Sequence, residues 1–374
     1  MSPSPFTIRA ATTADLRPLV ALENRCFRSD RLSQRQFRYL LTKAHATTLV
    51  AVEADVLLGY VLILFSRGTS MARLYSIAVA SESRGRGVAK ALVTAAERCT
   101  LEEERAYLRL EIRKDNSASI ALFEKLGYRR FGELPRYYED QMDGWRYERA
   151  LSPELRPRLV KVPFYEQTLD FTCGPASLMM AMRALDPTAS FDRKSELRIW
   201  REATTIYMTS GHGGCGPFGL ALAAARRGFR VEVKVSDAGP HLIDSVRDQR
   251  KKEVIRLVQE DMLDQLESLQ VAVHYEEFSV AELEQRFAAE EIPVVLTSSY
   301  AIYREKFPHW VVLTGSDEHF IYVHDPFVDY EEGETVVDSI NMPIPKQQFE
   351  RMTRYGKRRL RAAVLISRFP SIEE

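Results

Sequence analysis

The first 150 residues alternate short apolar runs with amphipathic segments, an order that predicts strands interleaved with helices. Strands are expected at 8–10, 48–53, 56–65, 73–80 and 106–113. The pair Ala54-Asp55 lies between two of these runs and predicts a β-hairpin. One helix is expected from Val88, where apolar residues recur at helical spacing, and another after Asn116, with Gly127 at its end. The pattern is typical of an α/β domain.

The second half has its helical patterns early and its strand-like runs late, an order that favours an α+β domain. Helices are expected at 174–185 and 217–228, and after the capping-box sequence that begins at Ser279. Strands are expected at 229–235, 292–297, 310–314 and 320–324. Residues 241–270 are strongly charged and predict one long helical stretch.

A segment with two prolines and flanking charges, Ser152 to Pro157, separates the halves and is typical of a linker. We therefore expect domains at 1–151 and 161–374, joined by a linker at 152–160. The composition, 45% hydrophobic and 28% charged, is ordinary for globular proteins. Each half therefore has enough apolar residues for a core of its own.

Charge, cysteine content and apolar run length limit the partners and the cellular compartment that the sequence allows. Residues 1–150 carry a net charge of +6 (24 Lys and Arg against 18 Asp and Glu), and the remainder carries −6. This is far from the basic stripe of a nucleic-acid-binding protein, so no nucleic-acid partner is expected. The four cysteines are too scattered for a disulfide framework, and the chain shows no secretory signal. The longest apolar run, 56–65, is too short to span a bilayer, so we expect a cytoplasmic protein without membrane association.

The sequence Arg84-Gly85-Arg86-Gly87-Val88-Ala89 joins an expected strand to an expected helix. Its glycines allow the positive φ angles that let backbone N–H groups converge on one ligand, and the start of a helix attracts anions. The two arginines add positive charge. These features suit a pyrophosphate, and a glycine-rich turn that only connects strand to helix is the alternative.

This loop, the strand before it and the run 108–128 resemble the GNAT acetyltransferases, in particular the subgroup that acetylates ribosomal-protein N-termini. Residues 23–27 are also similar to that subgroup, and the resemblance covers roughly 6–150. It implies acetyl-CoA, or an acyl-CoA with a longer chain, as cofactor. The residues implied to hold it are Ile77, Val79, Arg84, Gly85, Arg86, Gly87, Val88, Ala89 and Asn116.

The reaction that this resemblance implies is direct attack of an amine on a thioester. It needs a base for the ammonium and an acid for the leaving thiolate. The resemblance assigns the acid to Tyr137 and the base to Glu124. A core position for Tyr137 or Tyr138, and a solvated position for Glu124, are the alternatives. The expected acceptor is a peptide or protein, with a small amine as the other candidate.

The second half contains a cysteine, Cys173, whose local sequence favours a reactive thiol. Cys173 precedes Gly174-Pro175 and an apolar helix, and a thiol at a helix N-terminus faces the positive end of the helix dipole. Gln167 is a candidate oxyanion donor, and His309 and Asp325 lie on consecutive strands that can bring a base and its orienting carboxylate together. The alternatives are a small buried hydrophobe for Cys173 and a structural histidine for His309.

Four short sequence segments within 160–330 resemble the C39 family of papain-like cysteine peptidases. They are Gln167, Cys173-Gly174-Pro175-Ala176, His309-Trp310-Val311-Val312 and Asp325-Pro326. The resemblance implies a papain-like fold and a cysteine, histidine and aspartate that hydrolyse a peptide or amide bond. Thr172 stands where these peptidases often have Asp, 241–270 is an insert, and no transporter segment follows. These departures argue against the usual double-glycine leader substrate.

A metal site is not expected, because Gly211-His212-Gly213-Gly214-Cys215 offers two ligands and zinc takes at least three from the protein. We expect a bifunctional enzyme, an acetyl-CoA-dependent N-acetyltransferase fused to a cysteine peptidase or amide hydrolase. In one alternative the C39-like half binds peptide without hydrolysing it. In another the GNAT half senses acyl-CoA without turnover.

Overall fold

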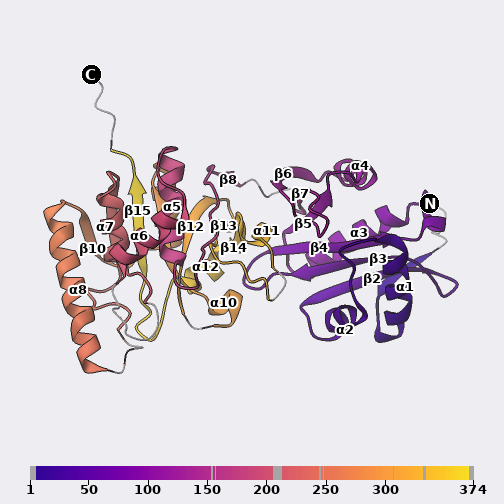
Figure 1. Cartoon of the computed structure of the whole chain (residues 1–374), viewed down its shortest axis with the longest axis horizontal. Helices are drawn as coiled ribbons and strands as arrows, with labels where there is room; N and C mark the ends of the chain where they lie inside the picture. The colour runs from indigo at the N-terminus through magenta and orange to yellow at the C-terminus, as the bar shows by residue number, and fades with distance from the viewer. Residues whose placement is uncertain are drawn as a thin grey trace, which may run out of the picture. The chain divides into compact units, whose positions relative to one another are not determined.

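The computed structural model describes residues 6–152, 155, 157–204, 213–243, 246, 248–305, 307–331 and 334–369. Two compact units, Met1–Leu155 and Arg156–Glu374, each contain their own sheet (Figure 1). The expected linker at 152–160 and the loop at 211–215 both include residues that lie outside the described ones. The domain boundaries given above stay predictions.

The N-terminal unit is built on a seven-stranded sheet in the order β1-β2-β3-β4-β5-β7-β6. Its strands are β1 (Thr7–Ala10), β2 (Ala46–Glu53), β3 (Val56–Phe65), β4 (Met71–Val79), β5 (Tyr107–Arg113), β6 (Arg129–Leu134) and β7 (Gly144–Ala150). Neighbouring strands are antiparallel, except that β4 and β5 are parallel. The β2–β3 turn places Ala54 and Asp55 at φ angles of 46° and 65°, the left-handed conformation that a two-residue hairpin favours.

Helices cover both faces of this sheet. They are α1 (Leu16–Cys26), α2 (Gln34–Thr42), α3 (Val88–Glu102) and α4 (Ser117–Lys125), with 3-10 turns at Thr13–Asp15 and Ser81–Ser83. Leu19 of α1 and Phe37 of α2 are buried against one face, while Leu92 of α3 and Phe123 of α4 are buried against the other. Each such side chain contributes about 1.5–3 kcal/mol relative to leaving it exposed. Helices therefore pack against and stabilise both faces of the sheet.

Strands β4 and β5 separate after a short contact. Their register pairs only Met71–Arg73 with Tyr107–Arg109, although β4 continues to Val79 and β5 to Arg113. In the described part of the chain, the rest of this β4 edge has no neighbouring strand, so its backbone N–H and C=O groups have no ladder partner on that side. Such an edge can pair with the amide groups of an extended ligand.

The C-terminal unit is built on a sheet in the order β10-β9-β15-β11-β12-β13-β14, with β8 paired to the end of β12. Its strands are β8 (Arg158–Leu159), β9 (Arg230–Val235), β10 (Ala272–Tyr275), β11 (Ile292–Ser298), β12 (Pro308–Ser316), β13 (Phe320–His324), β14 (Met342–Pro345) and β15 (Ala362–Ser367). The strand that comes last in the chain, β15, lies inside the sheet between β9 and β11. The sheet is therefore complete only when this distant segment is in place.

The helices of this unit also cover both faces of their sheet. They are α5 (Cys173–Leu185), α6 (Arg193–Ala203), α7 (Pro217–Ala225), α8 (Gln249–Ser268), α9 (Val280–Ala288), α10 (Tyr300–Tyr303), α11 (Val336–Ser339) and α12 (Lys346–Met352). Helices α5 to α8 share one core with the sheet, and α9 and α12 share the other. A Cβ at Gly219 would overlap the backbone of Ala203, so the close approach of α6 and α7 requires glycine there.

The expected fold classes, α/β for the N-terminal half and α+β for the C-terminal half, are confirmed. The prediction of one helix over 241–270 is wrong at its start, because α8 begins only at Gln249. Asp248 caps that helix, and His241 before it is held in a turn. Its backbone N–H donates to the Gln259 side chain and its carbonyl accepts from that side chain, both at 2.8 Å.

Candidate active sites

Cys173 is the first residue of α5, where the backbone N–H groups have no partner inside the helix. Its exposed fraction is 8%, so most of the residue is protected from solvent. One turn further on, the Ser177 hydroxyl donates to the Trp310 carbonyl oxygen at 2.9 Å. This bond fixes the start of α5 against β12, the strand that carries His309.

His309 lies on β12 and Asp325 directly follows β13, and these two strands pair with Val312 opposite His324. The distance from His309 Nε2 to Asp325 Oδ1 is 2.6 Å, and both residues are buried. Because Nε2 faces the carboxylate, Nδ1 is the nitrogen left for the thiol. Cys173 is also among the groups that raise the pKa of His309. The structure therefore brings together the three residues that the sequence proposes.

The electrostatics of His309 favour its charged form. Burial acts to lower the pKa of His309, since it penalises the imidazolium. The charge and hydrogen bond of Asp325, followed by those of Cys173, outweigh burial and raise the pKa to about 10. The surroundings of His309 therefore favour the imidazolium over the neutral ring.

Two further donors hold Asp325. The Tyr303 hydroxyl donates to Oδ2 at 2.9 Å, and the Phe327 backbone N–H donates to Oδ1 at 2.9 Å. The Tyr303 ring also stands edge-on to the His309 ring, with 5.9 Å between centroids. Burial raises the pKa of Tyr303, so its hydroxyl stays a donor. No sequence motif marks Tyr303, because it lies in the short helix α10 and reaches the site only through the fold.

Gln167 lies beside the pair. Its backbone N–H donates to the Pro326 carbonyl oxygen at 2.8 Å, which ties the loop before α5 to the residue after Asp325. Its side-chain Nε2 donates to the Leu169 carbonyl oxygen at 3.0 Å. An oxyanion role needs the second N–H of this amide to face the thiol, so that role stays a prediction.

A buried carboxylate fastens the loop that leads into α5. Glu196 of α6 is 0% exposed and accepts hydrogen bonds from the backbone N–H and the hydroxyl of Thr168, at 2.8 and 2.7 Å. It also accepts from the hydroxyls of Thr172 at 2.5 Å and Tyr165 at 3.0 Å. Tyr165 and Thr168 lie on either side of Gln167, and Thr172 directly precedes Cys173. Glu196 therefore positions both, a role that no sequence motif reveals.

The glycine loop of the N-terminal unit has the geometry of an anion cradle. Gly85 and Gly87 have φ angles of 75° and 81°, and Gly87 is the N-cap of α3. Among the described residues, no atom lies within 4 Å of a Cβ built at either position, so backbone conformation rather than crowding favours glycine. Arg84 is exposed, whereas Arg86 pairs with Glu53 at 2.8 Å. The N–H groups of Val88 and Ala89 begin the helix behind this loop.

Three other predicted cofactor residues lie on β4 and at the start of α4. Ile77 and Val79 are half-buried on β4, past the point where it separates from β5. Asn116 caps α4, because its side-chain oxygen accepts from the Ser119 N–H at 3.1 Å. The NH₂ group of Asn116 is the part left for a ligand.

Tyr137 accepts a hydrogen bond from a buried arginine. Arg73, on β4 where the two strands separate, donates from Nη2 to the Tyr137 oxygen at 2.7 Å. The same guanidinium pairs with Glu111 of β5 at 2.8 Å. A positive charge beside a phenol favours the phenolate that forms when the proton leaves. Tyr138 packs edge-on against Tyr137, with 5.1 Å between ring centroids.

Glu124 and Tyr137 have different partners. Glu124 is exposed on α4, and the Tyr147 hydroxyl of β7 donates to its Oε1 at 2.9 Å. These hydrogen bonds attach Glu124 to β7 and Tyr137 to β4. The acid and base roles of these two residues stay predictions.

Glu23 is a buried carboxylate on α1, inside the run 23–27 that resembles the acetyltransferase subgroup. The Leu32 N–H donates to it at 2.9 Å, and the Tyr60 hydroxyl donates to its other oxygen. The Tyr60 oxygen also lies 2.8 Å from the Ser76 hydroxyl of β4. Burial raises the pKa of Glu23. This chain of contacts links α1 to the open part of β4.

Comparison with known proteins defines the class of each half. Residues 16–128 match the Acetyltransferase (GNAT) family, and residues 162–367 match the Peptidase_C39 like family, the latter over more than half of the 374 residues. The protein thus joins an acetyltransferase domain to a C39-like domain. The chain belongs to the Peptidase_C39 like family, with a GNAT acetyltransferase domain before the matched region.

Curated relatives match the N-terminal part. N-alpha-acetyltransferase 30 of Schizosaccharomyces pombe is 30% identical over 122 residues, which are 32% of this chain and 81% of that protein. The N-alpha-acetyltransferase of Saccharolobus solfataricus is 27% identical over 157 residues, 39% of this chain and 93% of that protein. One similar solved structure is that of the ribosomal-protein-S18-alanine N-acetyltransferase from Escherichia coli, which is 22% identical in sequence. The match covers 40% of this chain and 99% of that chain, with a TM-score of 0.36.

The GNAT match makes the N-terminal half an N-acetyltransferase domain, and the family uses acetyl-CoA as its acyl donor. The positive-φ glycines at the start of α3 and the open edge of β4 fit this cofactor, because they offer backbone donors to a pyrophosphate and to an extended arm. Within the described residues, no three His, Cys, Asp or Glu side chains group to hold a metal. No helix in the same ranges is both long and apolar enough to cross a bilayer.

Proposed function

We propose that this protein is a bifunctional enzyme that acetylates peptide N-termini and hydrolyses a peptide or amide bond. The N-acetyltransferase class follows from the family match, whereas the acceptor and the hydrolysis are the proposal. Relatives named N-alpha-acetyltransferases support a peptide or protein N-terminus as acceptor, with a small amine as the second candidate. The observation that carries the hydrolase is the buried His309–Asp325 pair, with Cys173 among the groups that raise the pKa of His309.

In the N-terminal domain the residues of the chain hold the acyl donor and move protons. Acetyl-CoA, when bound, supplies an acetyl group activated as a thioester. The N–H groups of Val88 and Ala89 and the exposed Arg84 would hold its pyrophosphate, and the β4 edge at Ile77 and Val79 would pair with its arm.

Proton transfer falls to Tyr137 and Glu124. The Tyr137 oxygen accepts from Arg73, and the arginine charge would stabilise the phenolate that results when Tyr137 donates its proton. Glu124 is the candidate base for the acceptor ammonium. Its Oε1 accepts from Tyr147, which leaves Oε2 to take the proton.

In the C-terminal domain the proposed reaction proceeds through an acyl-enzyme. The Cys173 thiolate attacks the carbonyl carbon, and the electron pair of the C=O bond moves onto oxygen. When that pair returns, the C–N bond breaks and His309 gives its proton to the leaving amine. Water, deprotonated by His309, then attacks the thioester and releases the carboxylic acid and the thiolate. Asp325 orients the imidazole throughout.

Peptide binding without hydrolysis is the second candidate for the C39-like domain. One observation favours it: the Gln167 amide donates to the Leu169 carbonyl oxygen, as it would in a loop without an oxyanion to stabilise. Hydrolysis requires this amide, or the N–H at the start of α5, to serve a tetrahedral oxyanion.

Mass spectrometry of a defined peptide library separates these functions. The library is incubated with the full-length protein or its Cys173→Ala variant, with and without acetyl-CoA. We expect new peptide termini only with the wild-type thiol, and acetylated N-termini with either protein only when acetyl-CoA is present. Peptides bound but uncleaved by the wild-type protein would support the binding module and overturn the hydrolase.

A further inference from the structure

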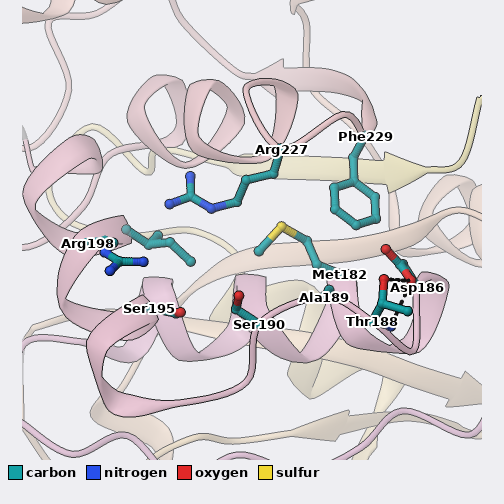
Figure 2. A pocket seen from close by; sticks show the side chains of 10 residues that line it. Met182, Asp186, Thr188, Ala189, Ser190, Ser195, Arg198, Arg227 and Phe229 are labelled. Atoms are coloured by element: carbon teal, nitrogen blue, oxygen red, sulfur yellow. Dashed lines mark hydrogen bonds between the residues drawn. The ribbon is translucent and has the colours of Figure 1, made fainter.

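A pocket at the C-terminal end of α5 serves neither proposed reaction. It lies between the end of α5, the loop that follows it, α6 and the turn before β9 (Figure 2). Met182 of α5 lines it, nine residues after Cys173. At 1.5 Å per residue that is roughly 13–14 Å along the helix axis. The pocket is therefore separate from the thiol site.

The pocket has a cationic side. Arg198 of α6 and Arg227, after α7, both line it, and Figure 2 shows them across Met182 from Asp186. Arg227 is already paired with Glu202, at 2.6 Å. Arg198 makes no hydrogen bond or ion pair with any residue in the described ranges, and its charge interacts with Asp192. Its guanidinium N–H groups can therefore donate to a ligand.

The opposite side carries the Asp186 carboxylate, on which the charges of Arg368 and Arg183 also act. The backbone N–H and the hydroxyl of Thr188 both donate to Asp186 Oδ1, at 2.8 and 2.7 Å. These two hydrogen bonds lower the pKa of Asp186, so the carboxylate stays charged at neutral pH. The other oxygen, Oδ2, is left for a donor from a ligand.

Between the two charged sides the lining is apolar with two hydroxyls. Met182, Ile199 and Phe229 supply the apolar surface, and Ser190 and Ser195 the hydroxyls. The volume is about 260 Å³, just below the roughly 300–1,000 Å³ of most small-molecule sites. A short ligand with opposite charges at its two ends matches this lining.

We propose that this pocket binds a peptide of two or three residues with both termini free. The C-terminal carboxylate lies at Arg198, and the N-terminal ammonium lies at Asp186. An extended chain spans about 3.3–3.6 Å per residue, so a peptide of two or three residues holds its terminal charges about 7–11 Å apart. In a single amino acid both charges sit on one carbon and cannot separate in this way. An N-acetylated peptide has lost its ammonium and is rejected.

Calorimetric titration of the full-length Cys173→Ala protein tests this, because the substitution prevents turnover of the probe. The probes are trialanine, N-acetyl-trialanine and trialanine amide. We expect trialanine to bind at least about threefold more tightly than either blocked peptide, since each block removes one ion pair. Equal binding of the three, or no binding of trialanine, overturns the proposal.

Pocket variants in the same background distinguish this site from the two catalytic sites. Arg198→Gln and Asp186→Asn are each expected to weaken trialanine binding by at least about threefold. Arg193→Gln is the matched control, an exposed arginine of α6 outside the pocket, and leaves the affinity unchanged. Unaltered affinity in both pocket variants contradicts the proposal, whatever the thiol and acetyl-transfer assays show.

Discussion

The Thr172 hydroxyl, one residue before Cys173, lies 2.5 Å from a carboxylate oxygen of Glu196. The C39 peptidases that this half resembles often have aspartate at the Thr172 position. Here the carboxylate comes from another helix, α6, and a threonine donates to it. The loop before α5 therefore keeps a buried carboxylate partner despite the departure in sequence.

Replacing that carboxylate is expected to loosen the thiol site. Glu196→Ala leaves buried donors of Thr168 and Thr172 unpaired, which should lower the free energy of unfolding by about 1–3 kcal/mol and slow alkylation of Cys173. Urea denaturation and iodoacetamide kinetics measure the two effects. Glu202→Ala, on the same helix, breaks a partly exposed ion pair and is the control, with an expected loss below about 1 kcal/mol. Equal behaviour of the two variants contradicts this role.

The His309–Asp325 pair predicts a pH-dependent stability. The pKa of His309 is raised to about 10 from its ordinary 6.5, so between these values the native state holds a proton that the unfolded chain releases. The free energy of unfolding should therefore fall as pH rises through this window. Asp325→Asn removes the charge that raises this pKa, and should flatten the slope. An unchanged slope in urea titrations across the window argues against the ion pair.

Acetyl transfer should depend on the Tyr137 hydroxyl. Tyr137→Phe removes the proposed proton donor but keeps the ring, so kcat should fall about 100-fold with little change in the KM for acetyl-CoA. Tyr138→Phe is the matched control, because Tyr138 packs against the same ring and has no assigned role. Steady-state kinetics with a peptide acceptor measure both. Equal effects of the two substitutions on kcat would contradict the assignment of Tyr137 as the proton donor.

Cofactor binding should depend on the backbone conformation of the glycine loop. Gly87→Ala places a side chain at a φ of 81°, at a cost of about 1 kcal/mol, and should raise the KM for acetyl-CoA. Gly356→Ala introduces similar strain at a φ of 69° in the other unit, and should lower stability without changing that KM. A KM for acetyl-CoA that rises equally in both variants contradicts the proposal that the glycine loop holds the pyrophosphate.

The sequence predicts those features whose signal is local. The glycine loop, the cap at Asn116 and the helix start at Cys173 each depend on neighbouring residues, and all three have the expected local structure. Tyr303 and Glu196 act through contacts between distant segments, which spacing along the chain does not reveal. The same reason accounts for β15, whose place inside the sheet depends on partners far earlier in the sequence.

The helix expected over 241–270 shows a second reason why local sequence does not predict every feature of the fold. Composition predicts helix throughout, but side-chain hydrogen bonds between Gln259 and the backbone of His241 hold the first residues in a turn. Local propensity is thus overridden by a contact that forms only in the folded unit.

Alkylation of Cys173 at neutral pH tests the hydrolase most directly. Iodoacetamide labelling followed by mass spectrometry gives the rate at each cysteine, with Cys26 as the reference because burial raises its pKa. We predict that Cys173 reacts at least about tenfold faster than Cys26, and that His309→Ala abolishes the difference. A Cys173 no more reactive than Cys26, or one whose rate is unchanged in His309→Ala, would contradict an imidazole-activated thiol.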